Sequence, residues 1–311
     1  MVNLNEKMPI ELICEDSLSA IKRLPNEAFK LVVTSPPYNI GKSYERNLNL
    51  TLKEYEKWLE PLVSSIYDVL SPDGHVCWQV GNHVRNGELF PLDYTFFNLF
   101  HNAGFKLRNR IVWRFNFGLN ANRRFSGRYE TLLWLTKGDQ YSFNLDNVRV
   151  PQLYPGKRHS RGQKVGLPSG NPLGKNPGDF WEFEFDPQEA FFDNPVWDIP
   201  NVKARHPEKT EHPCQFPVEL AERCVLALTQ PGDWILDPFS GVGSSIIAAR
   251  KNGRLAVGIE KEQKYIDVSL SRLDKLNSGD LETRPLGKPV RRPKAGERVS
   301  QVPDEWRLAA E

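Results

Sequence analysis

The residues Ser35-Pro36-Pro37-Tyr38 directly follow an apolar, β-branched run at 29–34. This pattern predicts a buried strand that ends in a turn, because two consecutive prolines fix φ and remove two backbone donors. Carbonyl oxygens near the prolines then lack sheet partners, and they lie beside a serine hydroxyl and an aromatic ring. Such a turn suits a flat group with an amino substituent, since the oxygens can accept hydrogen bonds from the NH2 group while the ring stacks. For a bare Pro-Pro pair, an ordinary strand-ending turn is the more common explanation.

A second, glycine-rich motif lies far downstream, between a predicted strand at 234–236 and a predicted helix that begins near Ser244. Its glycines, at 241 and 243, would let the backbone approach a ligand closely, as in nucleotide-binding βα turns. The next predicted strand, 255–259, ends in Glu260, whose carboxylate is placed to accept hydrogen bonds from ribose hydroxyls. The motif is neither GxGxxG nor a P-loop. It therefore favours a nucleoside-type cofactor without phosphates.

Together these segments resemble the amino-group DNA methyltransferases, which transfer a methyl group from S-adenosyl-L-methionine to N4 of cytosine or N6 of adenine. The likeness covers most of residues 8–275. Residues 35–38 match the catalytic tetrapeptide of the family, and residues 237–243 match its cofactor loop. The catalytic motif precedes the cofactor motif here, which is the permuted order of the group usually called beta.

The resemblance implies further contacts with the cofactor. Residues 212–217 look like the segment that closes over its methionine end, and residues 14–18 look like the acidic motif near the adenine ring. The implied cofactor-binding residues are Asp16, His212, Gln215, Pro217, Asp237, Pro238, Phe239, Ser240, Gly241, Gly243, Ser244 and Glu260. A helix N-cap is an equally good explanation of Asp16, and His212 is also compatible with an ordinary loop.

The chemistry that the resemblance implies is direct methyl transfer to an exocyclic amine. Such an amine is a poor nucleophile, because its lone pair is delocalised into the ring. Hydrogen bonds to Ser35 and to the Pro36 carbonyl would direct the lone pair at the methyl group, while Tyr38 stacks on a base flipped out of the duplex. No covalent enzyme intermediate is required. We assign the one Pro-Cys pair, Pro213-Cys214, to the cofactor side and not to a nucleophile.

Composition limits the remaining options. The 311-residue chain is 39% hydrophobic with no long apolar run, so we expect a soluble, cytoplasmic protein with a substantial core. Its four cysteines are scattered and its histidines lack ligand spacing, so we expect neither disulfides nor a metal.

A net charge of +2 indicates no partner by itself, but the basic residues are unevenly distributed. Residues 149–176 are rich in basic, glycine and proline residues and contain no Asp or Glu, which suits contact with phosphates. A solvated loop is the alternative. The predicted DNA contacts are Arg123, Arg124, Arg128, Lys157, Arg158, Arg161, Lys164 and Lys175.

Alternating helical and strand patterns predict an α/β, Rossmann-like methyltransferase fold with a mostly parallel, doubly wound sheet. We expect residues 1–137 to form the catalytic half, 138–206 a loop-rich target-recognition insertion, 207–276 the cofactor-binding half and 277–311 a basic, flexible tail. Ser35 and Asp237 would then lie at the ends of neighbouring strands, so the amine and the cofactor would share one crevice.

The resulting prediction is a site-specific DNA methyltransferase that acts on cytosine N4 in double-stranded DNA. Serine at position 35 favours cytosine, because adenine-N6 enzymes usually carry aspartate there. The alternatives are an adenine-N6 enzyme, a methyltransferase acting on RNA, on protein glutamine or on a small molecule, and an inactive DNA-binding module. A cognate restriction endonuclease and a second copy of the chain are further candidate partners.

Overall fold

The computed structural model describes residues 10–39, 50–115, 120–152, 154–181, 202 and 206–286. In chain order the elements in these ranges are β1 (Ile10–Cys14), α1 (Ser17–Ile21), β2 (Phe29–Thr34), α2 (Leu52–Val69), β3 (Leu70–Val80), β4 (Asn82–Arg85), β5 (Glu88–Pro91), α3 (Leu92–Asn102), β6 (Lys106–Arg114), β7 (Tyr129–Thr136), the 3-10 helix η2 (Leu145–Val148), β8 (Phe180–Trp181), α4 (Val218–Leu228), β9 (Trp234–Asp237), α5 (Ser244–Lys251), β10 (Leu255–Glu260) and α6 (Gln263–Ser278).

Eight strands form one sheet in the order β1-β10-β9-β2-β3-β7-β6-β8. Neighbouring strands are parallel except at β7, which runs antiparallel to both β3 and β6. Strands β2 and β9 come from opposite ends of the described chain, and they pair in the middle of the sheet. The predicted α/β fold with a mostly parallel sheet is confirmed.

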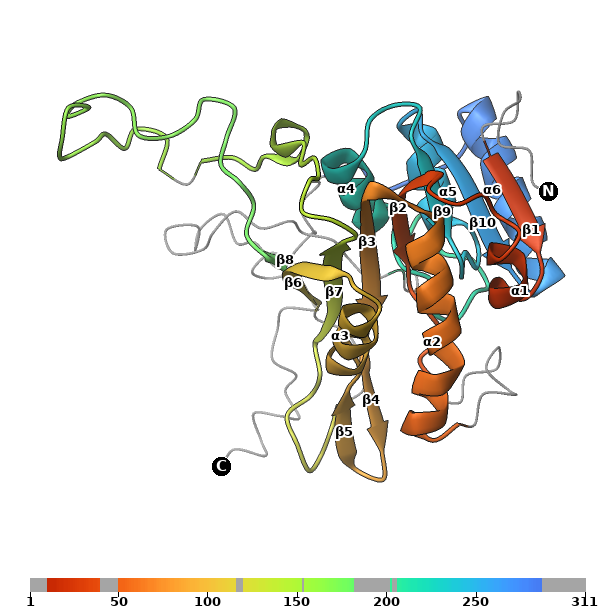
Figure 1. The fold of residues 1–311 in the computed structure, drawn as a ribbon. Helices are drawn as coiled ribbons and strands as arrows, with labels where there is room; N and C mark the ends of the chain where they lie inside the picture. The colour runs from red at the N-terminus through yellow and green to blue at the C-terminus, as the bar shows by residue number, and fades with distance from the viewer. Residues whose placement is uncertain are drawn as a thin grey trace, which may run out of the picture.

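Helices cover both faces of the sheet, with α2 and α3 on the near face and α4, α5 and α6 behind it in Figure 1. Strand β2 faces both layers, because successive side chains of a strand point to opposite sides. Leu31 and Val33 pack in the core beneath α4 and α5. Val32 packs in the core with α2 and α3. A continuous run of β-branched residues is typical of a strand buried in this way on both faces.

The element boundaries predicted above agree closely with the structure. The predicted strands at 29–34 and 255–259 correspond to β2 and β10, and the predicted helix that begins near Ser244 is α5, whereas β9 extends beyond position 236 to Asp237. Residues 71–74 lie inside β3. The pairing of β2 with β3 passes from Leu70 to His75, so these residues form a bulge in the strand. The short strands of the β4–β5 hairpin are largely exposed.

A long projection leaves the body of the molecule between η2 and β8 (Figure 1). We call residues 150–175, apart from position 153, the basic finger. Its two arms are joined by the antiparallel bridges Val150–Lys175 and Arg158–Pro168. Two backbone hydrogen bonds close the finger near its tip, from the His159 N–H to the Leu167 carbonyl and from the Gly166 N–H to the His159 carbonyl. The predicted insertion also includes residues 182–201 and 203–205, and the predicted tail includes 287–311, which lie outside the described residues.

Within the described ranges, no helix is both long enough and apolar enough to cross a membrane. The same residues contain no cluster of three or more His, Cys, Asp or Glu side chains that could hold a metal ion.

Candidate active site

The two sequence motifs meet at the carboxyl ends of β2 and β9. These strands pair in parallel through Leu31 with Ile235 and Val32 with Leu236. Just beyond these pairs, the Thr34 hydroxyl donates a hydrogen bond of 2.6 Å to the Asp237 carboxylate. We call residues 35–38, predicted above to be catalytic, the catalytic turn, and residues 238–243 the glycine loop. The two segments begin side by side, as the sequence predicts.

The catalytic turn is held by helix α2. The helix begins with a capping box between Thr51 and Glu54, which satisfies backbone donors at its first turn. In the same part of the helix, the Tyr55 hydroxyl donates a hydrogen bond of 2.5 Å to the Pro37 carbonyl. Because that carbonyl is engaged, the Pro36 carbonyl is the better candidate to accept a hydrogen bond from a substrate amine.

The hydroxyls of the turn lie close together. Ser35 Oγ is 3.0 Å from the phenolic oxygen of Tyr38. Beyond the turn, the Asn39 side chain bonds to both the backbone N–H and the carbonyl of Leu50. This pair of bonds ties the end of the turn to the residues that lead into α2.

Asp237 supports the glycine loop from inside the sheet. Its carboxylate is fully buried and accepts hydrogen bonds from Thr34, from the Ser245 hydroxyl and from the Phe239 backbone N–H. Burial raises the pKa of Asp237 to about 6, although these hydrogen bonds act in the opposite direction. The side chain therefore connects β2, β9 and α5, and it does not line the cavity described next.

A cavity of about 290 Å³ opens between the two motifs. Its walls come from both halves of the fold and mix aromatic rings, carboxylates and hydroxyls. The lining residues are Asp16, Ser17, Ser35, Pro36, Pro37, Tyr38, Trp58, His212, Cys214, Phe239, Gly241, Ile259, Glu260, Lys261 and Tyr265. All four predicted catalytic residues are among them, and so are five of the predicted cofactor residues: Asp16, His212, Phe239, Gly241 and Glu260.

The glycine loop and Glu260 form one wall of this cavity. The Glu260 carboxylate accepts hydrogen bonds from the N–H groups of Gly241 at 3.1 Å and Glu262 at 2.9 Å. Burial raises the pKa of Glu260 above its ordinary value. Gly241 has a φ of +50°, and a Cβ added there would lie 3.5 Å from His212 Nε2. Glycine thus allows the left-handed backbone, while the imidazole lies within ordinary contact distance.

His212 covers the glycine loop as an uncharged ring. Burial, with smaller contributions from Lys209 and Lys264, lowers its pKa to about 4. Its Nδ1 accepts a hydrogen bond from the Cys214 N–H at 3.2 Å. The imidazole packs edge-on against Tyr265, with the ring centres 4.5 Å apart. The segment that contains His212 is therefore fixed over the cavity by packing and by its own backbone.

A second cavity, of about 360 Å³, reaches the catalytic turn at Tyr38. Tyr38 and Cys214 line both cavities. The second cavity is lined by the ends of β3, β6 and β7, by the β4–β5 hairpin and by residues 213–216, with Gln79, Trp113 and Glu130 among its walls. A flat group placed there would lie beside Tyr38, which also lines the first cavity.

The comparisons with known proteins identify the family. A family model for N6/N4 methyltransferases, described as DNA methylase, matches residues 29–271. The chain belongs to the N6/N4 amino-group DNA methyltransferases. It is 43% identical to type II methyltransferase M.BglII from Bacillus subtilis over 82% of this chain and 66% of that protein. It is 37% identical to type II methyltransferase M.ScaI from Streptomyces caespitosus over 83% of this chain and 79% of that protein.

Solved structures show the same fold. PvuII DNA methyltransferase, described as cytosine-N4-specific, is 20% identical with a TM-score of 0.63, covering 86% of this methyltransferase and 89% of that chain. TTHA0409 from Thermus thermophilus, solved in complex with S-adenosyl-L-methionine, is 23% identical with a TM-score of 0.58, covering 85% of this methyltransferase and 95% of that chain. Membership of the family makes S-adenosyl-L-methionine the methyl donor of this enzyme.

The residues of the first cavity fit this cofactor. Trp58, Phe239 and Ile259 offer apolar surface to an adenine ring, and the Trp58 and Phe239 rings lie 6.3 Å apart. Glu260 offers carboxylate oxygens to ribose hydroxyls. Asp16 is also the N-cap of α1, where its side chain accepts a hydrogen bond from Ser19 N, so both roles suggested by the sequence are compatible. When bound, the cofactor supplies a methyl group on a positively charged sulfur.

The other predicted cofactor residues of the methyltransferase lie outside the wall of this cavity: Gln215, Pro217, Asp237, Pro238, Ser240, Gly243 and Ser244. Some of them support the lining residues. Gln215 accepts hydrogen bonds from the N–H and hydroxyl of Thr210, and its own amide donates to the Glu208 carbonyl. Conversely, no sequence pattern pointed to Trp58, Lys261 or Tyr265, because their helix and loop positions carry no motif.

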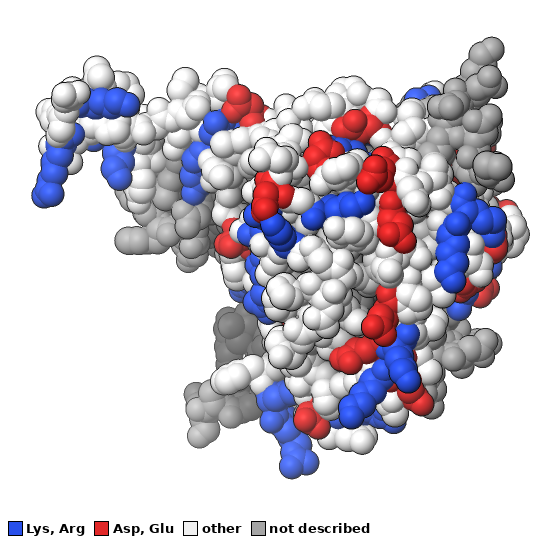
Figure 2. Space-filling model, viewed as in Figure 1, with Lys and Arg blue, Asp and Glu red and all other residues white. Residues whose placement is uncertain are grey.

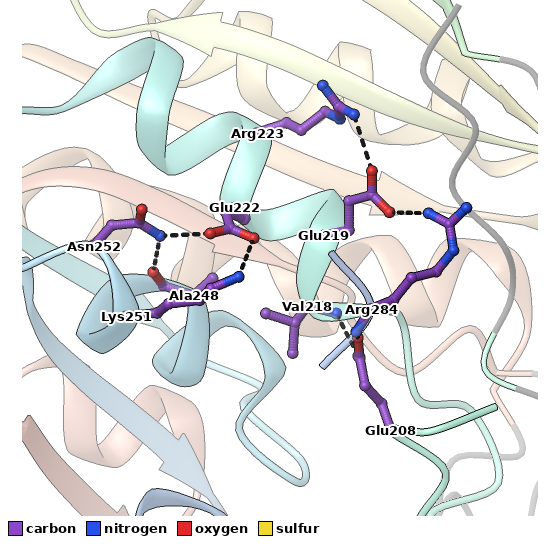
Figure 3. Close-up of polar contacts among 9 residues, drawn as sticks. All are labelled: Glu208, Val218, Glu219, Glu222, Arg223, Ala248, Lys251, Asn252 and Arg284. Atoms are coloured by element: carbon purple, nitrogen blue, oxygen red, sulfur yellow. Dashed lines mark hydrogen bonds and ion pairs between the residues drawn. The ribbon is translucent and has the colours of Figure 1, made fainter. Parts of the chain in front are cut away.

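A buried polar network anchors the segment that carries His212 (Figure 3). Glu208, just before that segment, accepts hydrogen bonds from the backbone N–H groups of Val218 and Arg284. Glu219 is completely buried on α4 and pairs with both Arg223, at 2.9 Å, and Arg284, at 2.5 Å. Arg284 belongs to the segment 277–311, predicted above to be a basic tail. In the structure its side chain is buried in an ion pair with Glu219.

Replacing Arg284 by alanine should destabilise the methyltransferase by about 2 kcal/mol, because Glu219 loses one of two charged hydrogen-bond partners. Cofactor affinity should also fall, because the ion pair with Glu219 no longer fixes residue 284, whose backbone N–H donates to Glu208 just before the segment that carries His212. Chemical denaturation and calorimetric titration with the cofactor would measure the two effects. Arg23→Ala is the matched control, because the ion pair of Arg23 with Glu15 lies at the surface, and it should change neither quantity appreciably.

The predicted DNA contacts of the methyltransferase fall in two places. Lys157, Arg158, Arg161 and Lys164 are exposed on the basic finger, and Figure 2 shows Lys and Arg side chains at its far end. Lys175 is half-buried at its base. Arg123, Arg124 and Arg128 precede β7, and Arg124 also lines the second cavity. The Arg128 guanidinium donates to the Asn120 side chain at 2.7 Å.

Proposed function

We propose that this methyltransferase is a site-specific type II enzyme that methylates the exocyclic N4 of cytosine in duplex DNA. The observation that carries the proposal is that all four residues of the catalytic turn line one cavity, while Tyr38 of the same turn also lines a second. One contains residues that fit the cofactor, and the other has room for a flipped base. Methyl transfer requires the two reactants to approach a common point, and Ser35 and Pro36 provide acceptors for the amine there.

We assign some residues of the two cavities to binding the cofactor and the base, and others to activating the amine. Asp16, Trp58 and Glu260 hold the cofactor in the first cavity. In the second, Tyr38 stacks on the base, with Trp113 available as a further aromatic wall. Ser35 and Pro36 accept hydrogen bonds from the amine, which favours a tetrahedral nitrogen with an available lone pair. Prealigned acceptors of this kind stabilise charge that develops in the transition state.

Serine at position 35 supports cytosine as the base, because a carboxylate there is the usual arrangement in adenine enzymes. Adenine N6 is the second candidate. It is favoured by the 29% identity with DNA adenine methyltransferase YhdJ from Escherichia coli, which spans 85% of this chain and 82% of that protein. Both amines need the same geometry.

The reaction is tested by incubating the purified full-length protein with labelled S-adenosyl-L-methionine and mixed-sequence duplex DNA. Nucleosides are then released by digestion and identified by mass spectrometry. We expect N4-methylcytosine. N6-methyladenine would overturn the choice of base and leave the reaction intact. Methylation of no nucleoside, with the cofactor still bound, would overturn DNA methylation as the function.

A partnership with a restriction endonuclease follows from the type II relatives M.BglII and M.ScaI. DNA methylated by this protein should resist an endonuclease that cleaves the same sequence. Mapping the methylated sites by sequencing identifies that sequence, and cleavage of fully methylated DNA by such an endonuclease would contradict this role.

The basic finger is the proposed surface for DNA phosphates and for target recognition. Changing Arg158, Arg161 and Lys164 together to glutamine should weaken binding and flatten its salt dependence. The slope of log affinity against log salt should decrease by nearly one for each phosphate that the variant no longer neutralises. Fluorescence anisotropy over a series of salt concentrations measures this slope. Neutralising three exposed lysines elsewhere, Lys22, Lys57 and Lys275, is the control, and an unchanged slope in the finger variant would move the DNA surface to another face.

A further inference from the structure

A chain of hydrogen bonds leads from the catalytic serine away from the cofactor. Ser35 Oγ lies 3.0 Å from the Tyr38 hydroxyl, and that hydroxyl donates over 3.5 Å to the Glu130 carboxylate. Glu130 belongs to β7, in the sheet half opposite to the cofactor strands. Catalytic hydrogen bonds are often long before the substrate binds and shorten in the complex. The arrangement therefore connects Ser35 to the carboxylate of Glu130, which is not itself one of the proposed hydrogen-bond acceptors of the amine.

Two neighbours hold the carboxylate in this position. The Gln79 amide donates a hydrogen bond to the same Glu130 oxygen that faces Tyr38. Gly81, directly after β3, leaves the space in which Tyr38 and Glu130 meet. A Cβ at position 81 would lie 3.1 Å from the Tyr38 ring and 3.4 Å from the other Glu130 oxygen. Both residues thus favour contact between the phenol and the carboxylate.

We propose that Glu130 accepts, through the hydroxyls of Tyr38 and Ser35, the proton that the target amine loses on methylation. The inference rests on the proposed function, since it concerns the same amine. It adds a proton acceptor to that site. By this assignment Tyr38 has two roles: its ring stacks on the base, and its hydroxyl carries the proton.

Methyl transfer leaves the amine with one proton too many. The nitrogen forms a bond to the methyl carbon with its lone pair, and the bond from that carbon to sulfur breaks with its electron pair left on sulfur. The surplus proton moves from nitrogen to Ser35 Oγ as the serine proton moves to the Tyr38 oxygen and the tyrosine proton to Glu130. Glu130 becomes a neutral acid and later releases the proton to solvent.

The charged and titratable groups around Glu130 come from several elements. Tyr38 approaches from the turn, Arg124 and Tyr129 from the strand β7 and the residues before it, and Cys214 from the cofactor-side segment. Strand β3 contributes the uncharged Gln79. Glu130 must be a carboxylate to accept a proton, so methyl transfer should slow in acid that protonates it.

Two variants remove the relay without changing its shape: Tyr38→Phe keeps the stacking ring, and Glu130→Gln keeps the side-chain size. Each should lower the single-turnover rate about 100-fold, and the double variant should be no slower than either, because the groups act in series. Glu130→Gln should also lose the acidic limb of the pH profile. Formate should partly restore the rate of Glu130→Ala, which a purely structural role would not allow.

Binding provides a readout that is independent of turnover. Cofactor affinity by calorimetry, and the fluorescence of 2-aminopurine at the target position, should match the wild type in both shape-conserving variants. Wild-type rates with an unchanged pH profile in Glu130→Gln would overturn the relay alone. If the variants lose base flipping as well as the rate of methyl transfer, the relay would also be overturned, and Tyr38 and Glu130 would have a structural role. A wild-type protein that methylates no DNA would overturn the proposed function and the relay with it.

Discussion

Ser35→Ala should retain cofactor and DNA binding and lose roughly two to three orders of magnitude in the rate of methyl transfer, the usual effect of removing one preorganised polar group from a transition state. Ser35 lines the first cavity, and its hydroxyl contacts the hydroxyl of Tyr38. Removing the hydroxyl should therefore leave the fold unchanged, but the amine would lose the hydrogen-bond acceptor that aligns it. Single-turnover kinetics at saturating cofactor isolates this step.

Ser17→Ala is the matched control for this variant. Ser17 lines the same cavity, but its hydroxyl donates to the Pro238 carbonyl beside the glycine loop. We expect a weaker cofactor affinity and a nearly normal rate at saturation. A Ser35→Ala enzyme with an unchanged rate would remove that hydroxyl from the mechanism.

Asp237→Ala should destabilise the protein by about 5 kcal/mol, because it leaves three buried donors without an acceptor and each such loss costs about 1–3 kcal/mol. The donors are Thr34, Ser245 and the Phe239 N–H. Cofactor binding should disappear with the loop geometry. Denaturant unfolding measures the first effect, and calorimetry measures the second.

Asp237→Asn separates the charge from the hydrogen bonds. The folded-state pKa of about 6 lies above the ordinary value of 3.8, so the folded protein holds the proton more tightly than the unfolded chain. The wild type should therefore lose stability as the pH rises from 3.8 to about 6. The asparagine variant should lack this contribution and remain folded. A slope identical to that of the wild type would mean that Asp237 does not titrate in this range.

Sequence patterns predicted where the site lies better than they predicted how the side chains are used. Ser35 and Asp237 each follow a short apolar strand, and the rules for parallel sheets bring such strand ends together. However, the inward direction of the Asp237 carboxylate depends on Thr34, which is distant in sequence. That contact exists only once β2 and β9 pair, so no local pattern announces it.

The lining residues that the sequence patterns missed show the same limit. Trp58 is half-buried on α2 and packs against the core, and only the position of α2 over the turn brings its ring to Phe239. No sequence pattern singled out Glu130 in β7, and its meeting with Tyr38 depends on the space left by Gly81. For the basic finger, the sequence revealed the excess of basic residues but not the antiparallel arrangement of its two arms. The residues that form its bridges lack the periodicity of a strand.

The strand order has a consequence for synthesis of the protein. Strand β1 leaves the ribosome before the other described strands, but among them it pairs only with β10. One edge of β2 likewise has no partner until β9 has been synthesised. A nascent chain that ends before β9 can form β2, β3 and α2 but leaves apolar strand edges open. Pairings between distant segments form slowly, and open edges favour aggregation. Folding of the sheet centre, and with it methylation, must await synthesis of β9 and β10.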